Sequence, residues 1–402
     1  MITVERQPKV PITDIEQSAF CRTDESLEAK PLIEEFKAKV EWQPLPKDYM
    51  GLKPDELSDR IAAARAKLGD QLMILGHHYQ RDEIIKFADF RGDSYLLSQH
   101  AAKQKEAEYV VFCGVHFMAE TADILTGPNQ KIILPNMKAG CSMADMAPTE
   151  DALDAWEDLK SVVDGGLVPV TYMNSTADIK ALCGRNEGIV CTSSNAEEAF
   201  KWAFRRGEKI LFFPDQHLGR NTSLKLGIPI EEMVVWNPFK PLGGLTEAEI
   251  RNSKVILWQG HCSVHTRFTV KQIDEAREKF PEVQVVVHPE CVQEVVEAAD
   301  MDGSTEFIIK VVEEAPAGSI FGIGTEINLV NRLSNENPDK TIFCLDPVVC
   351  PCATMYRIHP AYLAWVAEGL VAGKVANQIT VNEDTAHYAR LALEQMLSLK
   401  RG

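Results

Sequence analysis

Long apolar runs are missing from this sequence. The longest stretches, such as the one around residues 110–112, fall far short of the about 20 residues that a helix needs to cross a bilayer. The opening MITVERQPKVPITD also lacks the basic and then apolar layout of a signal peptide. We therefore expect a cytoplasmic protein with no membrane partner. Its 402 residues, 45% hydrophobic and 25% charged, are typical of a globular chain with two or three domains.

A surplus of positive charge is absent as well. The formal net charge is −17 at pH 7, whereas a protein that binds nucleic acid needs a basic face to neutralise phosphates. This composition argues against a nucleic-acid partner. Small anionic substrates remain compatible with it, because they need only a local site.

Two common nucleotide-binding motifs, the P-loop and Gly-x-Gly-x-x-Gly, do not occur. The ten cysteines include no Cys-x-x-Cys pair. In a reducing compartment, cysteines are more often metal ligands or catalytic groups than disulfides. These absences favour metal chemistry on small molecules over nucleotide binding.

Regular structure is predicted from about residue 54 onward. Residues 1–50 contain five prolines and little periodicity, which indicates an extension with one helix near Leu32–Val40. Pro54–Leu68 is the first segment with helical spacing, because its apolar residues recur on one face.

Beyond that helix, six apolar runs of strand length end in polar residues and lead into helix-like segments. Three begin at Leu72, Lys131 and Lys254, and three of a second kind begin at Tyr109, Val168 and Val283. Two strand types that each occur three times predict three similar α/β units. Continuous apolar strands with intervening helices favour parallel sheets, in which ligands bind at the carboxyl ends of the strands.

Three cysteine sites follow predicted strands. Cys141 lies in KAGCSMAD, Cys262 lies in GHCSVH, and Cys350 and Cys352 lie in VVCPCATM. Three similar units could bring these sites to one point, where thiolates suit an Fe–S cluster or zinc. We interpret five other cysteines as small buried hydrophobic residues and assign no role to the cysteine of the extension. They are Cys113, Cys183, Cys191, Cys291 and Cys344, and in the extension Cys21.

Titratable and polar side chains stand at the ends of other strands. They are His77, His78 and Tyr79 after LMILG, Tyr172 and Asn174 after VPVT, and His288 and Glu290 after VVV. A histidine beside a carboxylate offers acid–base capacity near neutral pH, and Tyr and Asn orient polar substrates. A lone histidine after a strand is more often structural. His-Pro-Glu after a run of valines is less easily explained that way, because proline fixes the turn.

Small hydroxyl and amide residues mark three predicted helix starts. These are Gly92-Asp93-Ser94, Thr192-Ser193-Ser194-Asn195 and Gly303-Ser304-Thr305. Free N–H groups and the helix dipole favour anions at such positions. Simple N-capping explains each one taken alone, but three together suit a substrate with several carboxylates and a phosphate.

Ten of these segments, in this order, resemble the quinolinate synthase family over about 350 residues. They are GHHYQ, GDS, FMAETADIL, CSMADM, TYMNSTADIKA, CTSSNA, GHCSVH, HPEC, GSTEFII and CPC. The resemblance implies an α/β fold of three similar three-layer αβα domains, with short, mostly parallel sheets around a pseudo-threefold axis. The implied division is an N-terminal extension at 1–50, domain 1 at 51–130 completed by 345–402, domain 2 at 131–253 and domain 3 at 254–344.

The resemblance also implies a [4Fe–4S] cluster held by three cysteines, namely Cys141, Cys262 and one of Cys350 and Cys352. The family pattern Cys-Pro-x-x-x-Met points to Cys350, while longer relatives with Cys-Pro-Cys leave Cys352 open. Three protein ligands leave one iron able to act as a Lewis acid on the substrate.

The implied reaction condenses iminoaspartate with dihydroxyacetone phosphate to quinolinate, releasing phosphate and two waters, in NAD biosynthesis. A functional pairing with L-aspartate oxidase is implied too. We expect Glu290 to be the main acid–base residue, with Tyr79 as its partner and His265 as a further catalytic residue. The substrate-binding residues implied by motif are His77, Ser94, Tyr172, Asn174, Ser193, His288, Glu290 and Thr305.

Two features depart from the compact form of the family: the long extension, and about 50 residues containing FPDQHLGRNT before GHCSVH. Three alternative functions also stay open. Another Fe–S hydro-lyase would differ only in pocket shape. A non-catalytic Fe–S carrier needs four protein ligands and has little use for His-Pro-Glu. A zinc hydrolase would differ in metal content.

Overall fold

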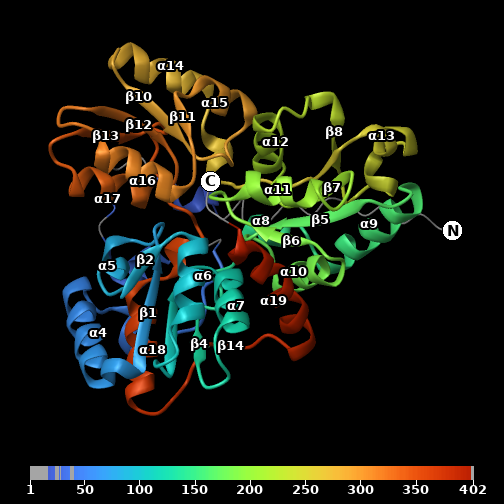
Figure 1. Cartoon of the computed structure of the whole chain (residues 1–402). Coiled ribbons are helices and arrows are strands. Elements are labelled where there is room, and N and C mark those ends of the chain that lie inside the picture. Colours follow the sequence, from blue (N-terminus) through green and yellow to red (C-terminus); the bar gives the residue numbers. More distant parts are fainter. Residues whose placement is uncertain (1–16, 23–26, 28, 37–39, 400–402) are drawn as a thin grey trace. The chain divides into compact units, whose positions relative to one another are not determined.

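The computed structural model describes residues 17–22, 27, 29–36 and 40–399 (Figure 1). They fold into two compact units, and neither is continuous in sequence. In their described parts, unit 1 contains Ser142–Val311 and residues 382–399. Unit 2 contains the described residues from 17 to 141 together with Val312–Val381.

Helices and strands alternate along most of the chain. The strands are β1 (Leu72–His77), β2 (Phe90–Gly92), β3 (Tyr109–Cys113), β4 (Lys131–Ile133), β5 (Leu167–Tyr172), β6 (Ile189–Cys191), β7 (Lys209–Phe213), β8 (Met233–Trp236), β9 (Val255–Trp258), β10 (Gln284–Val287), β11 (Met301–Asp302), β12 (Ile320–Gly324), β13 (Thr341–Cys344) and β14 (Gln378–Ile379). The α-helices are α2 (Leu32–Glu35), α3 (Lys47–Met50), α4 (Pro54–Leu68), α5 (Asp82–Ile85), α6 (Ser94–Lys103), α7 (His116–Leu125), α8 (Ser142–Asp145), α9 (Thr149–Val162), α10 (Ala177–Arg185), α11 (Ala196–Phe204), α12 (Gln216–Lys225), α13 (Glu247–Asn252), α14 (Val270–Lys279), α15 (Gln293–Ala298), α16 (Thr305–Glu314), α17 (Ile327–Glu336), α18 (Pro360–Val371) and α19 (Glu383–Ser398).

Unit 2 is built on a five-stranded sheet with the order β14-β4-β3-β1-β2. Its neighbouring strands are parallel except for β14, which runs antiparallel to β4. All six residues of β1 are buried, as expected for a central parallel strand with both faces covered. Helix α4 packs against α18 and has the bounds that its apolar spacing predicts. Its buried residues are Leu57, Ile61, Ala64 and Leu68. The part of the predicted helix near Leu32–Val40 that covers residues 37–39 lies outside the described residues.

Unit 1 contains a five-stranded, fully parallel sheet with the order β6-β5-β7-β9-β8. Alternate residues of β7 and β9 pack with α9 in one apolar cluster that includes Trp156, Phe213 and Trp258. The Phe213 and Trp258 rings lie 5.1 Å apart. This cluster anchors the strands whose carboxyl ends lead into Asp215 and Cys262.

A third sheet has four strands. In unit 1, β10 pairs in parallel with β11, and in unit 2, β12 pairs in parallel with β13. The α/β class with three mostly parallel sheets is therefore confirmed. Each of the six predicted apolar runs is a strand, namely β1, β3, β4, β5, β9 or β10. The four-part domain division and the pseudo-threefold axis remain predictions.

One local pattern occurs in both units. The Asp89 carboxylate accepts a hydrogen bond from the Ile74 N–H at 2.7 Å, and the Asp300 carboxylate accepts one from the Val285 N–H at 2.7 Å. Each aspartate directly precedes a short strand, β2 or β11, that pairs with the strand it contacts. The same strand–turn–helix–strand unit is thus built twice, in agreement with the predicted repetition.

The C-terminal helix α19 lies along α10 in unit 1 (Figure 1). Gly184 allows this close approach, since a Cβ atom at this position would lie 1.9 Å from the Tyr388 carbonyl oxygen. The Thr385 hydroxyl donates to the Asp178 carboxylate at 2.9 Å. Unit 1 is therefore completed by the last described residues of the chain.

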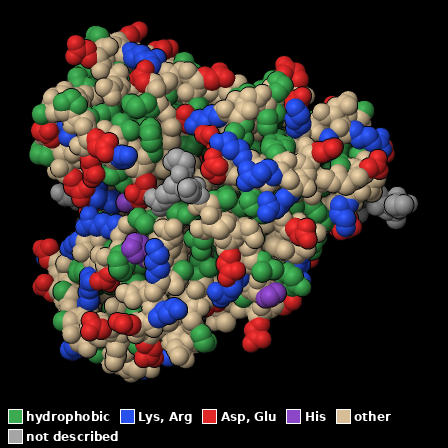
Figure 2. Space-filling view, viewed as in Figure 1, with side chains coloured by type: hydrophobic (Ala, Val, Ile, Leu, Met, Phe, Trp, Pro, Cys, Tyr) green, Lys and Arg blue, Asp and Glu red, His purple; other side chains and the backbone are tan. Residues whose placement is uncertain are grey.

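Acidic and basic side chains are interspersed over the face shown in Figure 2. No helix in the described part of the chain combines the length and the apolar character that a membrane span needs.

Candidate active site

The turn after β10 carries two of the predicted site residues. His288 and Glu290 follow this strand, with Pro289 between them. The Glu290 N–H donates a hydrogen bond to His288 Nδ1 at 3.3 Å. A neutral imidazole has one accepting and one protonated nitrogen. This contact therefore leaves the proton on Nε2, where it can be donated to a ligand oxygen.

The turn after β1 in unit 2 has the same construction. The Tyr79 N–H donates to His77 Nδ1 at 3.1 Å, and the two rings meet edge to face with 4.8 Å between their centroids. The Tyr79 hydroxyl is hydrogen-bonded to Thr325 Oγ1 at 2.9 Å. Both units therefore hold a histidine after a strand in a fixed ring orientation.

The Glu290 carboxylate is buried, and both of its oxygens are engaged within unit 1. The Tyr172 hydroxyl donates to Oε1 at 2.6 Å, and His265 Nδ1 lies 2.8 Å from Oε2. Burial alone would raise the pKa of Glu290. The positive charge of His265 and the hydrogen bonds from His265 and Tyr172 outweigh it and lower the pKa below its ordinary range. Glu290 is therefore ionised near neutral pH. The predicted site residue Asn174, two residues beyond Tyr172, is half-buried.

The His288 ring lies parallel to the His265 ring, with 4.5 Å between centroids and 18° between planes. Burial lowers the pKa of His288 to about 3, and the charge of His265 adds to this effect. His288 is therefore neutral at pH 7, as its contact with the Glu290 N–H requires.

Cys262, four residues after β9, lies beside this group in unit 1. Cys262 Sγ, a ring nitrogen of His265 and a carboxylate oxygen of Glu290 all lie within 4.8 Å of one another. Cys262 is half-buried and forms no disulfide. Thiolate, imidazole and carboxylate are common donors to transition metals. The three side chains are therefore placed where they can hold or face a metal.

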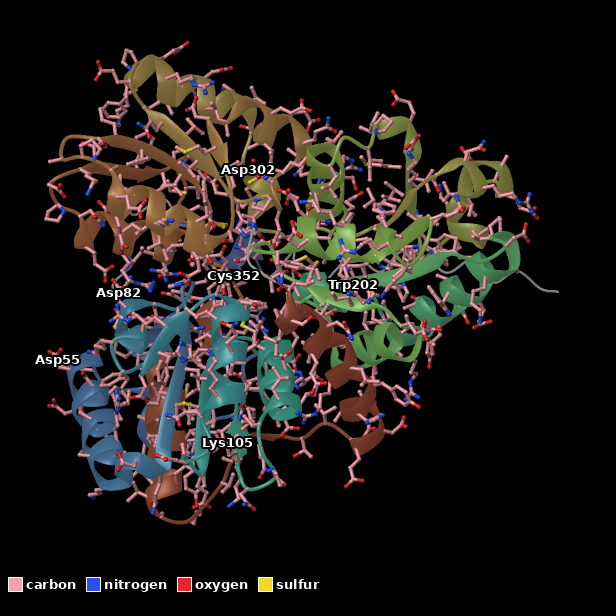
Figure 3. All side chains as sticks on the ribbon, in the orientation of Figure 1. Asp55, Asp82, Lys105, Trp202, Asp302 and Cys352 are labelled. Carbon is pink, nitrogen blue, oxygen red and sulfur yellow. A yellow bond between two sulfur atoms is a disulfide. The ribbon has the colours of Figure 1, made fainter. Side chains whose placement is uncertain are left out.

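The other candidate thiols belong to unit 2. Cys141 and Cys352 are half-buried and form no disulfide, whereas Cys350 forms one with Cys21. Cys352, labelled in Figure 3, donates its backbone N–H to Glu326 Oε1 at 3.0 Å. The sequence assigned no role to Cys21, and this pairing is a finding of the structure.

The Cys-Pro-Cys turn is held by a side chain from the N-terminal extension. The Gln17 amide donates to the Pro351 carbonyl at 2.7 Å, and the Gln17 carbonyl oxygen accepts from the Ala353 N–H at 2.9 Å. Phe20 packs edge to face on Tyr356 with 5.4 Å between ring centroids. The described part of the extension is therefore fixed against the turn that carries two candidate ligands.

The cysteines interpreted as hydrophobic residues differ in one case. Four are buried, and burial raises the pKa of each thiol, which disfavours the thiolate needed for metal binding. They are Cys113, Cys183, Cys191 and Cys291. Cys344 is half-buried, so this part of the interpretation was wrong. Its thiol contacts the Thr325 carbonyl at 3.8 Å.

The three predicted helix starts are confirmed. Ser94 and Thr305 are the first residues of α6 and α16, and Ser193 lies shortly before α11. Asp93 caps α6 by accepting the Leu96 N–H at 2.8 Å. Thr305 differs, because its buried Oγ1 has no hydrogen-bond partner within the described chain. A buried hydroxyl without a partner is unfavourable, so this group is available to a water or a ligand oxygen.

Helix α12 lies next to the site and was missed by the sequence analysis. Its N-cap residue Asp215 is fully buried, and burial and the neighbouring charge of Glu290 raise the pKa of Asp215 well above its ordinary range. The available signal was an aspartate, a common N-cap residue, in the segment FPDQHLGRNT, which the sequence analysis noted only as a departure from the family.

Comparison with known proteins agrees with these features. A family model described as "Quinolinate synthetase A protein" matches residues 59–398. The chain is similar to the quinolinate synthase of Corynebacterium glutamicum, with 60% identity over 358 residues that cover 89% of this chain and 91% of the relative. It is also similar to the quinolinate synthase of Nocardioides sp., with 57% identity over 88% of this chain and 92% of the relative. For the quinolinate synthase of Streptomyces coelicolor the identity is 55% over 88% of this chain and 91% of the relative. The chain therefore belongs to the quinolinate synthase family.

Proposed function

We propose that this chain is a quinolinate synthase. It condenses iminoaspartate with dihydroxyacetone phosphate to quinolinate, and phosphate and two waters leave. The observation that carries the proposal is the identity of 60% to a quinolinate synthase over 89% of the chain. The arrangement of Tyr172, His265 and Glu290 at one buried point supports it, since ring closure with loss of water needs an acid–base group.

A [4Fe–4S] cluster is the proposed cofactor, with Cys141, Cys262 and Cys352 as ligands. The donor set fits, because none of these three cysteines forms a disulfide and each is half-buried. When bound, a cluster with three protein ligands supplies a Lewis-acidic iron for a substrate oxygen.

Cys352 is preferred over Cys350 as the third ligand. The Cys350 sulfur is joined to Cys21 and lies 3.3 Å from the Gln17 amide nitrogen, so it is already engaged by the extension. The Cys352 sulfur contacts the Thr354 hydroxyl at 3.4 Å. A hydrogen bond to sulfur is compatible with a cluster ligand, and the absence of a disulfide at Cys352 decides the preference.

Glu290 is proposed to take a proton from the condensing substrates, because it is ionised and its two oxygens are oriented by Tyr172 and His265. His288 is proposed to donate its Nε2 proton to a substrate oxygen, because its Nδ1 is occupied by the Glu290 N–H. The unpartnered Thr305 hydroxyl is proposed to hold a carboxylate or phosphate oxygen.

The remaining predicted residues are proposed as substrate contacts. They are His77, Ser94, Asn174 and Ser193, while Tyr79 is proposed as the acid–base partner of Glu290 and His265 as a further catalytic residue. The fixed ring of His77 and the hydroxyl of Tyr79 suit a polar substrate, and Ser94 and Ser193 lie at helix starts that favour anions. A functional pairing with L-aspartate oxidase would supply iminoaspartate.

Anaerobic purification followed by iron, sulfide and activity measurements tests the proposal. We expect about four irons and four sulfides per chain, as a [4Fe–4S] cluster requires, and quinolinate formation only when both substrates are present. Cys262→Ser and Cys352→Ser should lose the cluster, and Cys350→Ser should keep it. A zinc-containing enzyme, or a full cluster that forms no quinolinate, would contradict the proposed function.

A further inference from the structure

Helix α12 contacts the backbone of two turns that carry site residues. At its first turn, the Gln216 N–H donates to the Gly260 carbonyl at 3.1 Å, two residues before Cys262. The Asp215 carboxylate caps the helix by accepting the Leu218 N–H at 3.0 Å. It also accepts a hydrogen bond from the backbone N–H of Cys262. The start of α12 is thus tied to the turn that carries Cys262.

The second contact is made by Asn221, in the next turn of α12. Its side-chain amide nitrogen donates to the Pro289 carbonyl at 2.9 Å and to the Cys291 carbonyl at 2.9 Å. Asn221 is 3% exposed, so water does not readily replace it. The two carbonyls belong to the residues on either side of Glu290.

These two hydrogen bonds fix the backbone of Glu290 while its side chain is fixed separately. Tyr172 and His265 orient the carboxylate, and Asn221 holds the carbonyl groups of the preceding and the following residue. A primary amide carries two N–H donors on one atom, so a single side chain can bind both carbonyls. An aspartate has the same shape but no donor, and it would face both carbonyls with negative charge.

We propose that Asn221 is a positioning residue for Glu290, and that α12 thereby couples the Cys262 turn to the His-Pro-Glu turn. This inference rests on the proposed function. Asn221 does not touch the reacting atoms in this scheme. It sets where the Glu290 carboxylate stands relative to them, and a shift of about 1 Å at such a group can lower the rate by about 100-fold.

The test compares anaerobic wild-type enzyme with Asn221→Asp and the milder Asn221→Ser, which retains one donor. We expect kcat per bound cluster to fall about 10- to 100-fold in Asn221→Asp and less in Asn221→Ser. KM and the quinolinate dissociation constant, measured from the change in the cluster absorption spectrum, should stay within about threefold, because substrate contacts are retained. Asn186→Asp is the matched control: Asn186 donates its amide to the Leu182 carbonyl at 2.8 Å on α10 in the same unit, and kcat should be unchanged.

Three results would overturn the inference. One is a kcat per cluster in both Asn221 variants equal to that of wild type. Another is a loss of activity that follows iron content or folded fraction alone, since Asn221 would then be only structural. The third is an equal loss in Asn186→Asp. Failure of the proposed function is distinguished from these, because wild-type enzyme with a full cluster would then form no quinolinate.

Discussion

Replacement of Glu290 by Gln tests the centre of the proposed mechanism. The substitution keeps the size and planarity of the side chain but removes the negative charge and the ability to accept a proton. Tyr172 can still donate to the remaining carbonyl oxygen. This bond becomes a neutral one, and the charged contact with His265 Nδ1, 2.8 Å from Oε2 in the wild type, is lost because an amide nitrogen cannot accept a hydrogen bond.

The expected magnitude follows from the role assigned to Glu290. Loss of a general acid–base group lowers turnover by about 10²- to 10⁴-fold, which corresponds to about 3–5 kcal/mol on the barrier at 1.36 kcal/mol per tenfold change. Loss of a charged hydrogen bond to His265 costs about 1.5–3 kcal/mol of stability. The protein should therefore remain folded.

The assay is anaerobic quinolinate formation from iminoaspartate generated in situ and dihydroxyacetone phosphate, normalised to iron content. Glu294→Gln is the matched control, since Glu294 is exposed and lies four residues away. A turnover for Glu290→Gln within threefold of the wild-type value, with a full cluster, would remove Glu290 from the mechanism.

Three further predictions follow from single contacts. Tyr172→Phe removes the 2.6 Å bond to Glu290. It should lower kcat about 10- to 100-fold at unchanged iron content, since a charged hydrogen bond contributes about 1.5–3 kcal/mol. An unchanged kcat would refute its role. Glu35 forms a buried ion pair with Arg81 at 2.9 Å. Burial raises the pKa of Glu35, but the charge of Arg81 and hydrogen bonds lower it from 4.5 to about 2. The ion pair therefore contributes about 3 kcal/mol of stability above pH 4.5, and this contribution is lost as the pH falls toward 2. Glu35→Gln should therefore destabilise unit 2 by about 3–5 kcal/mol at pH 7 and flatten this pH dependence. Urea unfolding monitored by hydrogen exchange measures both effects. Equal urea midpoints for the variant and the wild type at pH 7 would contradict the prediction. Gly184→Ala places a Cβ atom against α19. Overpacking should destabilise the protein by about 1–3 kcal/mol and lower its Tm by about 2–10 °C, as measured by calorimetry. An unchanged Tm would refute the close approach of the two helices.

Local patterns in the sequence predicted much of the fold. Pro54–Leu68 has the predicted bounds because its apolar spacing, an N-terminal proline and a following glycine all act within one segment. The strands were predictable because buried parallel strands form continuous apolar runs. The residues at their carboxyl ends became site candidates for the same reason.

The pairings between distant residues could not be predicted in this way. Tyr172 and Glu290 are 118 residues apart and Cys21 and Cys350 are 329 residues apart, and spacing alone carries no information about either contact. Asn221 was missed because its partners are backbone carbonyls, which every residue has. Only the path of α12 shows which two carbonyls it meets.

The order of segments in the two units has a consequence for synthesis of the chain. Unit 1 begins at Ser142 but is completed by α19 at the end of the chain, and unit 2 is interrupted between Cys141 and Val312. During translation, the α10 surface that α19 covers therefore stays open to solvent until α19 leaves the ribosome. A nascent chain that stalls before residue 382 would expose this surface, and we expect chaperones to bind such chains more strongly than the finished protein.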